Sequence, residues 1–140
     1  MPLERSDEKN PADWFYLAQD RLKIADLAWR QEGLTPAGVE LLQEAVERHL
    51  KGYLISQGWR LVKTHDLERL VSEASVYDAR FHQFALLADE LNRDFFTQHY
   101  PGGDWTDFGS NYEKLRADTG RLIELIAEIL PQYFPQPPTA

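Results

Sequence analysis

The chain has 140 residues, of which 43% are hydrophobic and 27% charged, so it has room for one domain with one sizeable core. Fifteen Lys and Arg against 23 Asp and Glu give a formal charge of −8, which argues against a general binder of nucleic acids or anionic membranes but leaves room for a local basic patch. The absence of cysteine excludes disulfide scaffolds, thiol catalysis and cysteine-ligated zinc or iron–sulfur sites.

The sequence predicts a single cytoplasmic domain over residues 1–140, with its core between about 12 and 130. The longest apolar runs, such as 14–18 and 84–88, are far shorter than the roughly 20 residues that a membrane helix needs. Residues 1–10 are polar and acidic, unlike a signal peptide, and the end of the chain is a proline-rich tail. We therefore expect no contact with a membrane.

Two long helices are predicted in the first half of the chain. Asn10-Pro11 is a helix start, with a capping side chain followed by a proline at the first helical position, and apolar residues recur at helical spacing from there to Gly33. Thr35-Pro36 repeats this start signal, and a second amphipathic pattern continues to Gly58.

Three further helices are predicted in the second half. Thr64 can cap a short helix that loses its pattern near Ser75. A fourth helix extends from Tyr77 to Phe95, before the Tyr100-Pro101 turn. The fifth begins at Ser110 and alternates three- and four-residue apolar steps as far as Ile129, a pattern typical of a bundle seam.

These elements predict an all-α fold, an antiparallel up-and-down bundle of four long helices and one short helix. Four aromatic residues of the first helix point to more than one of its sides: Trp14, Phe15, Tyr16 and Trp29. Such surplus aromatic surface favours a homodimer, although a small bundle could also bury it internally.

The common catalytic and metal-binding motifs are absent. The sequence has no glycine-rich phosphate loop, no His-Glu-x-x-His zinc motif, no EF-hand loop and no paired Glu-x-x-His of a di-iron bundle. We therefore expect neither a metal nor a cofactor. Acidic residues at four-residue spacing from other charges, such as Glu47 and Lys51, are interpreted as solvated helix faces.

One window of this acidic chain is locally basic, from Arg48 to Arg69. It contains the candidate phosphate-binding residues Arg48, Lys51, Lys63 and His65, together with Arg60 and His49. Such a cluster could neutralise the phosphate of a nucleotide or an RNA. Alternatively, the cations complement the dipole at the end of a helix.

A second window holds Arg93 and His99, which could cleave RNA without a metal. The histidine would act as a general base toward a 2′-hydroxyl, and the arginine would stabilise the pentavalent phosphate. The Arg-x(4–6)-His spacing is weak evidence, because Arg60 and His65 match it too.

Four segments together resemble HEPN domains (higher eukaryotes and prokaryotes nucleotide-binding). Residues 43–54 resemble the family's second-helix signature, and residues 64–67 its Thr/Ser-His-Asp-Leu motif. Residues 99–102 resemble the family's Arg-Tyr-Pro turn, with His99 in place of the arginine, and the opening helix also matches. The resemblance covers about residues 12–130.

The resemblance implies a helical bundle, usually dimeric, often accompanied by a small nucleotidyltransferase in a toxin–antitoxin-like pair. Some members are metal-independent endoribonucleases with an Arg-x(4–6)-His motif, whereas others bind nucleotides or RNA without cutting. We therefore expect a nucleotide- or RNA-binding module in which the basic window acts with Tyr100. An endoribonuclease using Arg93 and His99, and a scaffold for a partner protein, are the alternatives.

Overall fold

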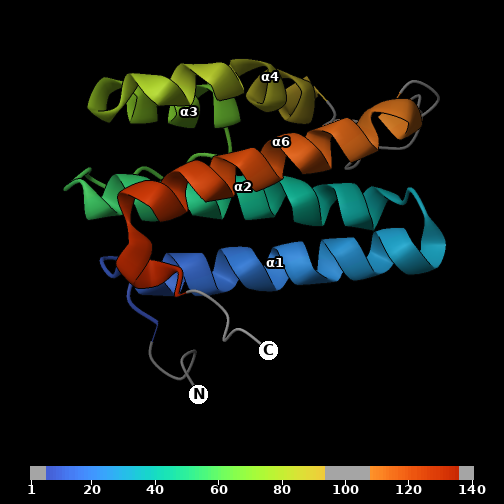
Figure 1. Cartoon of the computed structure of the whole chain (residues 1–140), viewed down its shortest axis with the longest axis horizontal. Helices are drawn as coiled ribbons and strands as arrows, with labels where there is room; N and C mark the ends of the chain where they lie inside the picture. The colour runs from blue at the N-terminus through green and yellow to red at the C-terminus, as the bar shows by residue number, and fades with distance from the viewer. Residues whose placement is uncertain (1–5, 94–107, 136–140) are drawn as a thin grey trace.

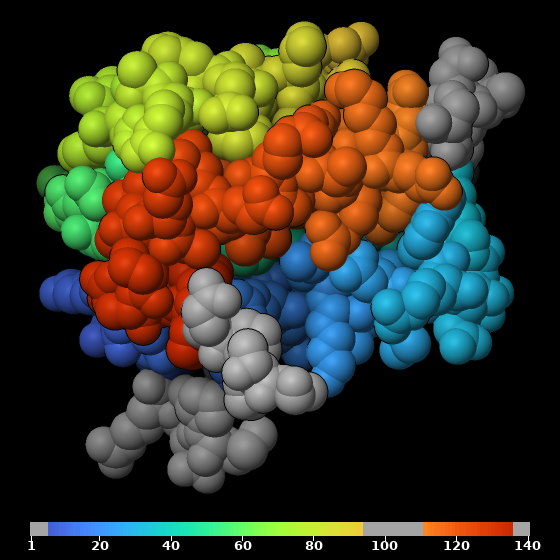
Figure 2. Space-filling view, viewed as in Figure 1, coloured from blue at the N-terminus to red at the C-terminus, as the bar shows by residue number. Residues whose placement is uncertain are grey.

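The computed structural model describes residues 6–93 and 108–135. Three long helices, α1 (Pro11–Glu32), α2 (Pro36–Ser56) and α6 (Phe108–Ile129), lie side by side in Figure 1. α3 (Leu67–Tyr77), the 3₁₀ helix η1 (Ala79–Phe84) and α4 (Ala85–Arg93) form the edge opposite α1. Figure 2 shows α6 lying over the middle of the molecule.

The all-α prediction is confirmed, since the described residues contain no strand. Helices of adequate length and apolar character to cross a membrane are likewise missing from residues 6–93 and 108–135.

The predicted starts of α1 and α2 are confirmed by their caps. The Asn10 side chain accepts a hydrogen bond from the Ala12 amide at 3.0 Å, and the Thr35 hydroxyl accepts one from the Gly38 amide at 3.0 Å. Each satisfies a backbone donor that the first helical turn leaves without a partner. α1 ends at Gly33, whose φ of 73° is readily available to glycine alone.

The region predicted as one fourth helix from Tyr77 to Phe95 is divided in the structure. Asp78 has an extended backbone, with φ of −152° and ψ of 112°, and its carboxylate accepts a hydrogen bond from the Arg80 amide at 3.0 Å. Asp78 therefore ends α3 and caps η1, because its carboxylate satisfies a backbone amide at the start of the new helix. The α4 helix therefore begins only at Ala85.

The predicted seam of the last helix is confirmed. Five of its residues are buried in the common core: Tyr112, Leu115, Thr119, Leu122 and Ile126. Beyond α6, the short 3₁₀ helix η2 (Pro131–Tyr133) turns the chain back, and the Tyr133 and Phe134 rings pack against Phe15 of α1. The last helix thus closes the bundle over both α1 and α2.

α2 is the central helix, since it packs against α1, α3 and α6. From Ala45 to Leu54 every residue except Arg48 is buried. A helix buried on nearly all sides cannot send its polar side chains to water, so these must find partners inside the protein.

The close approach of α1 and α2 depends on Gly52. A Cβ atom at this position would lie 2.7 Å from Cε1 of the buried Phe15 ring. That ring cannot move away freely, because Tyr133 and Phe134 pack against it with ring centroids at 5.5 and 4.8 Å. Glycine is therefore needed here for space and not for backbone conformation.

We expect Gly52→Ala to lower the free energy of unfolding by about 1–3 kcal/mol, since it overpacks the α1–α2 contact. Urea unfolding followed by circular dichroism measures this change. The matched control is Gly120→Ala in α6, where the new Cβ would meet Arg116 at an ordinary 3.6 Å. Gly120→Ala should raise the free energy of unfolding by about 0.5–1 kcal/mol, because alanine has the higher helix propensity. Equal effects of the two substitutions would contradict the steric argument.

Candidate functional site

The second half of α2 contains a buried ion pair. Glu47 and Lys51 are each only 4% exposed, and the Lys51 Nζ donates to Glu47 Oε2 at 2.9 Å. The interpretation of these two residues as a solvated helix face is therefore wrong. Their four-residue spacing was visible in the sequence, but their burial arises from elements that cover α2 from other parts of the chain.

The same carboxylate binds a second donor, from the loop after α2. Nδ1 of His65 lies 2.7 Å from Glu47 Oε1, while 73% of the His65 side chain is exposed. Because a carboxylate accepts, Nδ1 carries the proton and donates it to Glu47. The outer imidazole nitrogen, Nε2, is left on the exposed part of the ring.

A short hydrogen-bond network fixes the loop that carries His65. Asp66, not Thr64 as predicted, caps α3, since its carboxylate accepts from the Arg69 amide at 3.3 Å. The Asn92 side chain of α4 donates to Asp66 at 2.8 Å and accepts from the Leu67 amide at 3.0 Å. The start of α3 is therefore anchored to both α2 and α4.

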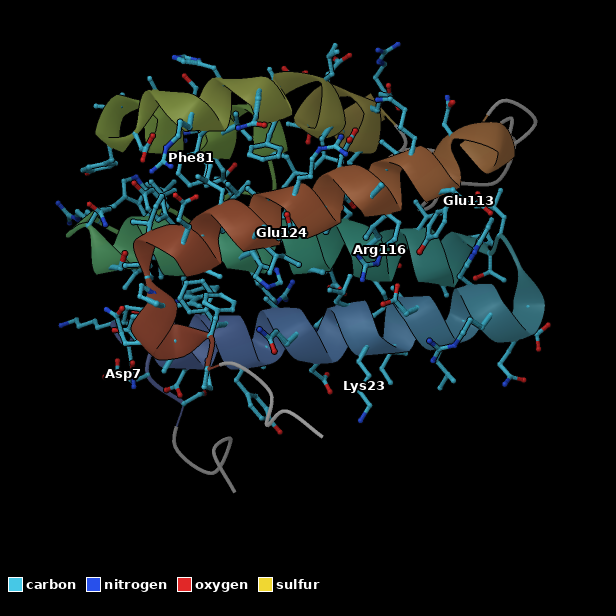
Figure 3. The ribbon with its side chains drawn as sticks, viewed as in Figure 1. Asp7, Lys23, Phe81, Glu113, Arg116 and Glu124 are labelled. Atoms are coloured by element: carbon cyan, nitrogen blue, oxygen red, sulfur yellow. The ribbon has the colours of Figure 1, made fainter. Side chains whose placement is uncertain are left out.

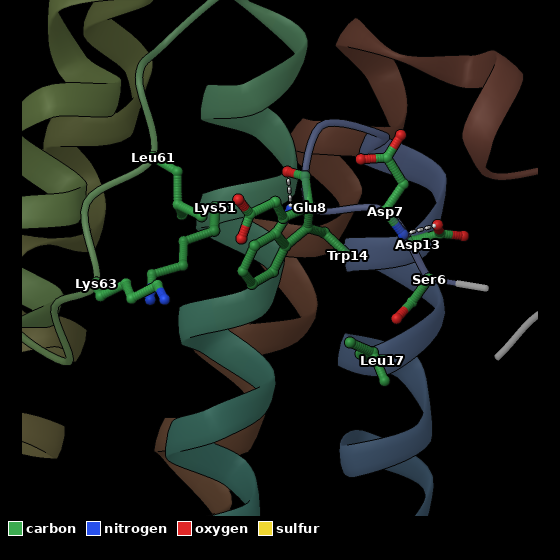
Figure 4. Close-up of a pocket in the computed structure, with 9 residues that line it drawn as sticks. All are labelled: Ser6, Asp7, Glu8, Asp13, Trp14, Leu17, Lys51, Leu61 and Lys63. Carbon is green, nitrogen blue, oxygen red and sulfur yellow. Dashed lines mark hydrogen bonds between the residues drawn. The ribbon is translucent and has the colours of Figure 1, made fainter. Parts of the chain in front are cut away.

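A pocket with a volume of about 190 Å³ lies beside the buried ion pair. Lys51, Leu61 and Lys63 line one side of it, from α2 and the following loop, as Figure 4 shows. The other side is formed by α1 and the segment before it, with Ser6, Asp7, Glu8, Asp13, Trp14 and Leu17. The pocket thus has lysines on one wall and carboxylates on the other.

Trp14 connects the two walls. Its ring lies under the Lys51 ammonium, with Nζ 5.7 Å from the ring centroid, a distance at which a cation is attracted to the aromatic face. Its indole Nε1 donates to the Glu8 carbonyl at 2.8 Å, and Asp13 accepts from the Asp7 amide at 2.7 Å. These bonds hold the segment before α1 against the pocket.

The structure brings together some of the predicted binding residues and separates another. Lys51 and Lys63 share the pocket, and Lys51 is linked to His65 through Glu47. Arg48 lies apart, because its guanidinium pairs with Glu44 at 3.8 Å. Tyr100, the remaining predicted binding residue, lies outside the described residues.

The predicted catalytic pair cannot be assembled from the described residues. Arg93, at the end of α4, forms an ion pair with Asp89 on the same helix and its side chain is 70% exposed. His99 lies outside the described residues. Cleavage by this pair stays a prediction.

His49 falls in the basic window but belongs to the core. Its ring is fully buried between Phe15 and Phe134, with centroid distances of 6.2 and 6.4 Å. Nδ1 lies 2.8 Å from the Ala45 carbonyl and therefore donates to it, while Nε2 has no hydrogen-bond partner among the described residues. Burial lowers the pKa of His49 to about 4, so the ring is neutral at pH 7 and adds no charge to a phosphate site.

Several residues of this site were not predicted from the sequence, among them Glu47, Trp14, Asp7 and Asp13. In the sequence, Trp14 stood out only as one of four aromatic residues that point to more than one side of α1. That aromatic surface is mostly used internally, because Phe15 is buried and Trp29 stacks on Tyr112 with a centroid distance of 4.4 Å. The two aspartates carried no signal, since acidic residues near a helix start are common.

The family model described as HEPN domain matches residues 12–130. No curated protein and no solved structure matches the chain.

We expect Glu47→Gln to lower the free energy of unfolding by about 3–5 kcal/mol, because it leaves the buried Lys51 ammonium without a counter-charge. Chemical denaturation at pH 7 measures the loss. The matched control is Glu44→Gln, which removes the more exposed partner of Arg48 on the same helix and should cost about 1 kcal/mol or less. A loss at Glu47 no larger than the control would contradict a role for the buried pair.

We expect the stability of the protein to fall as the pH drops from about 6.5 to about 4, partly because of His49. The pKa of His49 is lower in the folded protein than in the unfolded chain. The neutral ring therefore contributes about 3 kcal/mol to the free energy of unfolding above pH 6.5, and this contribution is lost at lower pH as protons bind the unfolded chain. The free energy of unfolding, measured across this pH range, should fall less steeply for His49→Phe than for the wild type. The same pH dependence in both proteins would contradict the lowered pKa of His49.

Proposed function

The chain belongs to the HEPN domain family, and from that membership we propose that it binds the phosphate of a nucleotide or an RNA in the pocket lined by Lys51 and Lys63. The family is associated with nucleotide and RNA binding and with RNase activity. The observation that carries the proposal is that two lysines, twelve residues apart in the sequence, line the same side of one pocket, with the Trp14 ring beside them.

The two lysines on one wall of the pocket suit a phosphate held on that side. Ammonium groups bind phosphate through charge-assisted hydrogen bonds. Lys51 is fixed by its bond to Glu47, so little conformational entropy is lost when one of its remaining protons meets an anion. Lys63 is exposed and can complete the contact from the loop.

The acidic wall suits the rest of a nucleotide. Carboxylates accept hydrogen bonds from ribose hydroxyls and from the amino groups of bases. A cavity of about 190 Å³ is smaller than the roughly 300–1,000 Å³ of sites that enclose a whole drug-sized ligand. The pocket therefore encloses one part of a nucleotide and leaves the remainder outside.

The charge of −8 for the whole chain limits how a polyanion would bind. A long RNA would be repelled by most of the surface, and only a segment at the pocket would be attracted. A free nucleotide or an RNA end is therefore favoured over a long RNA that follows the surface.

The expected partner is a separate part of the proposal. A small nucleotidyltransferase, acting with this chain in a toxin–antitoxin-like pair, follows from the family resemblance alone. It stays a prediction.

We expect isothermal titration calorimetry to detect binding of AMP, ATP or a short single-stranded RNA to the wild-type protein. Lys63→Ala should raise the Kd about tenfold, since it removes one exposed cation that contacts the phosphate. Lys63 is the residue to change because substitution of the buried Lys51 would disturb folding as well as binding.

The matched control is Lys114→Ala, which removes the same charge from an exposed residue of α6. It should leave the Kd unchanged, and added salt should weaken binding by the wild type. Failure of every probe to bind the wild type would contradict the proposal and favour the scaffold. An equal loss of affinity in Lys63→Ala and Lys114→Ala would show that the pocket is not the binding site.

A further inference from the structure

A second pocket, with a volume of about 420 Å³, adjoins the first pocket, which is the one lined by Lys51 and Lys63. The two pockets share Glu8 and Leu61 in their walls. Both lie at the end of the bundle where α1 begins and α2 ends, as Figure 1 shows, and the labelled Asp7 marks this end in Figure 3. A ligand that fills the first pocket and crosses the shared edge therefore enters the second.

The second pocket contains an aromatic ring that is held in place. Ile55 from the last turn of α2 and Trp59 and Leu61 from the following loop give the pocket its apolar wall. The Trp59 backbone amide donates to the Leu54 carbonyl at 3.0 Å, and its indole Nε1 donates to Glu73 Oε2 at 3.1 Å. A ring fixed in this way can stack on a nucleobase with little loss of entropy.

Two cations in the wall of the second pocket are available to an anion. Lys9, before α1, and Arg60, after α2, are exposed, and neither side chain forms an ion pair in the described part of the chain. The carbonyls of Leu54 and Ile55 at the end of α2 accept bonds from the backbone amides of residues 57–59, so Arg60 is not needed as a cap. Ammonium and guanidinium groups both bind phosphate through charge-assisted hydrogen bonds.

The second pocket repeats part of the composition of the first. Each contains two cations and one tryptophan, which are Lys51, Lys63 and Trp14 in the first pocket and Lys9, Arg60 and Trp59 in the second. A ligand that suits both pockets should therefore repeat a phosphate. A nucleotide chain does so, with one phosphate and one base in each unit.

The shared edge indicates what part of such a chain lies between the two pockets. The Glu8 carboxylate belongs to both walls, so it would repel a phosphate at the edge but would accept a hydrogen bond from a ribose hydroxyl. A ribose with one phosphate on each side meets this condition, whereas the contiguous phosphates of a nucleoside triphosphate do not. Within a chain the free hydroxyl is the 2′-OH, which RNA has and DNA lacks.

We propose that the two pockets together bind the end of an RNA chain through two successive phosphates. One phosphate lies at Lys51 and Lys63. The next lies at Lys9 and Arg60, and the base beyond it stacks on Trp59. This inference rests on the proposed function and narrows its ligand from any nucleotide or RNA to an RNA end of two linked units.

Isothermal titration calorimetry with a series of adenine nucleotides tests the proposal. Adenosine 3′,5′-bisphosphate carries one phosphate on each side of its ribose, whereas its isomer ADP carries both phosphates on one side. The bisphosphate should bind about tenfold tighter than ADP, because it alone reaches both pairs of cations. The dinucleotides pApA and ApAp add a second base in either direction, and one of them should bind about tenfold tighter again by stacking on Trp59.

Variants separate the contributions of the two pockets. Arg60→Ala should reduce the ratio between the Kd of ADP and the Kd of the bisphosphate from about ten to about one, because the second phosphate loses its guanidinium. Lys63→Ala should raise both Kd values and keep the ratio. The matched control is Arg30→Ala, which removes the same side chain from an exposed position in the last turn of α1 and should leave every Kd unchanged. Circular dichroism verifies that the variants fold.

The results distinguish this inference from the proposed function. If no ligand of the series, AMP included, binds the wild type, the proposed function fails. If AMP binds but the bisphosphate binds no tighter than ADP, the second pocket holds no phosphate and only this inference fails. It fails as well if Arg60→Ala keeps the tenfold ratio or if neither dinucleotide binds tighter than the bisphosphate. Equal affinity for pApA and its deoxy counterpart pdApdA would contradict the ribose contact at Glu8.

Discussion

The structure depends on the burial of α2, which places charged residues where water cannot reach them. The buried Glu47 carboxylate is satisfied by two hydrogen bonds, which it accepts from Lys51 at 2.9 Å and from His65 at 2.7 Å. An unpaired charge at this depth would cost several kcal/mol, so the three side chains must hold one geometry. That geometry ties α2 to the loop before α3 and sets Lys51 against the Trp14 ring.

The same constraint explains how an acidic chain keeps two lysines together on one wall of a pocket. Lys51 is kept in place by a carboxylate behind it and an aromatic ring beside it, while Lys63 approaches from the loop. Folding has already fixed the buried lysine, which would lower the entropy lost if the proposed phosphate bound. The pocket walls come from α1 and the segment before it, and from α2 and the loop after it, so only the folded chain forms the pocket.

Much of the fold could be predicted from the sequence, but less of the site. The starts at Pro11 and Pro36 and the seam of α6 are local patterns, and the structure confirms them. The break at Asp78 was missed, because its carboxylate caps a new helix within an otherwise continuous apolar pattern. For the site, the sequence placed Lys51 and Lys63 in one basic window but also included His49, which is buried and neutral.

The sequence by itself determined the all-helical architecture, because helical periodicity and capping depend on residues within a few positions of one another. Only the tertiary structure decided which charges are buried, since Glu47 and Lys51 show the same spacing as an exposed pair. Burial depends on elements that fold over α2 from distant parts of the chain. For the same reason, only the packed bundle shows which apolar residues of α1 stay exposed.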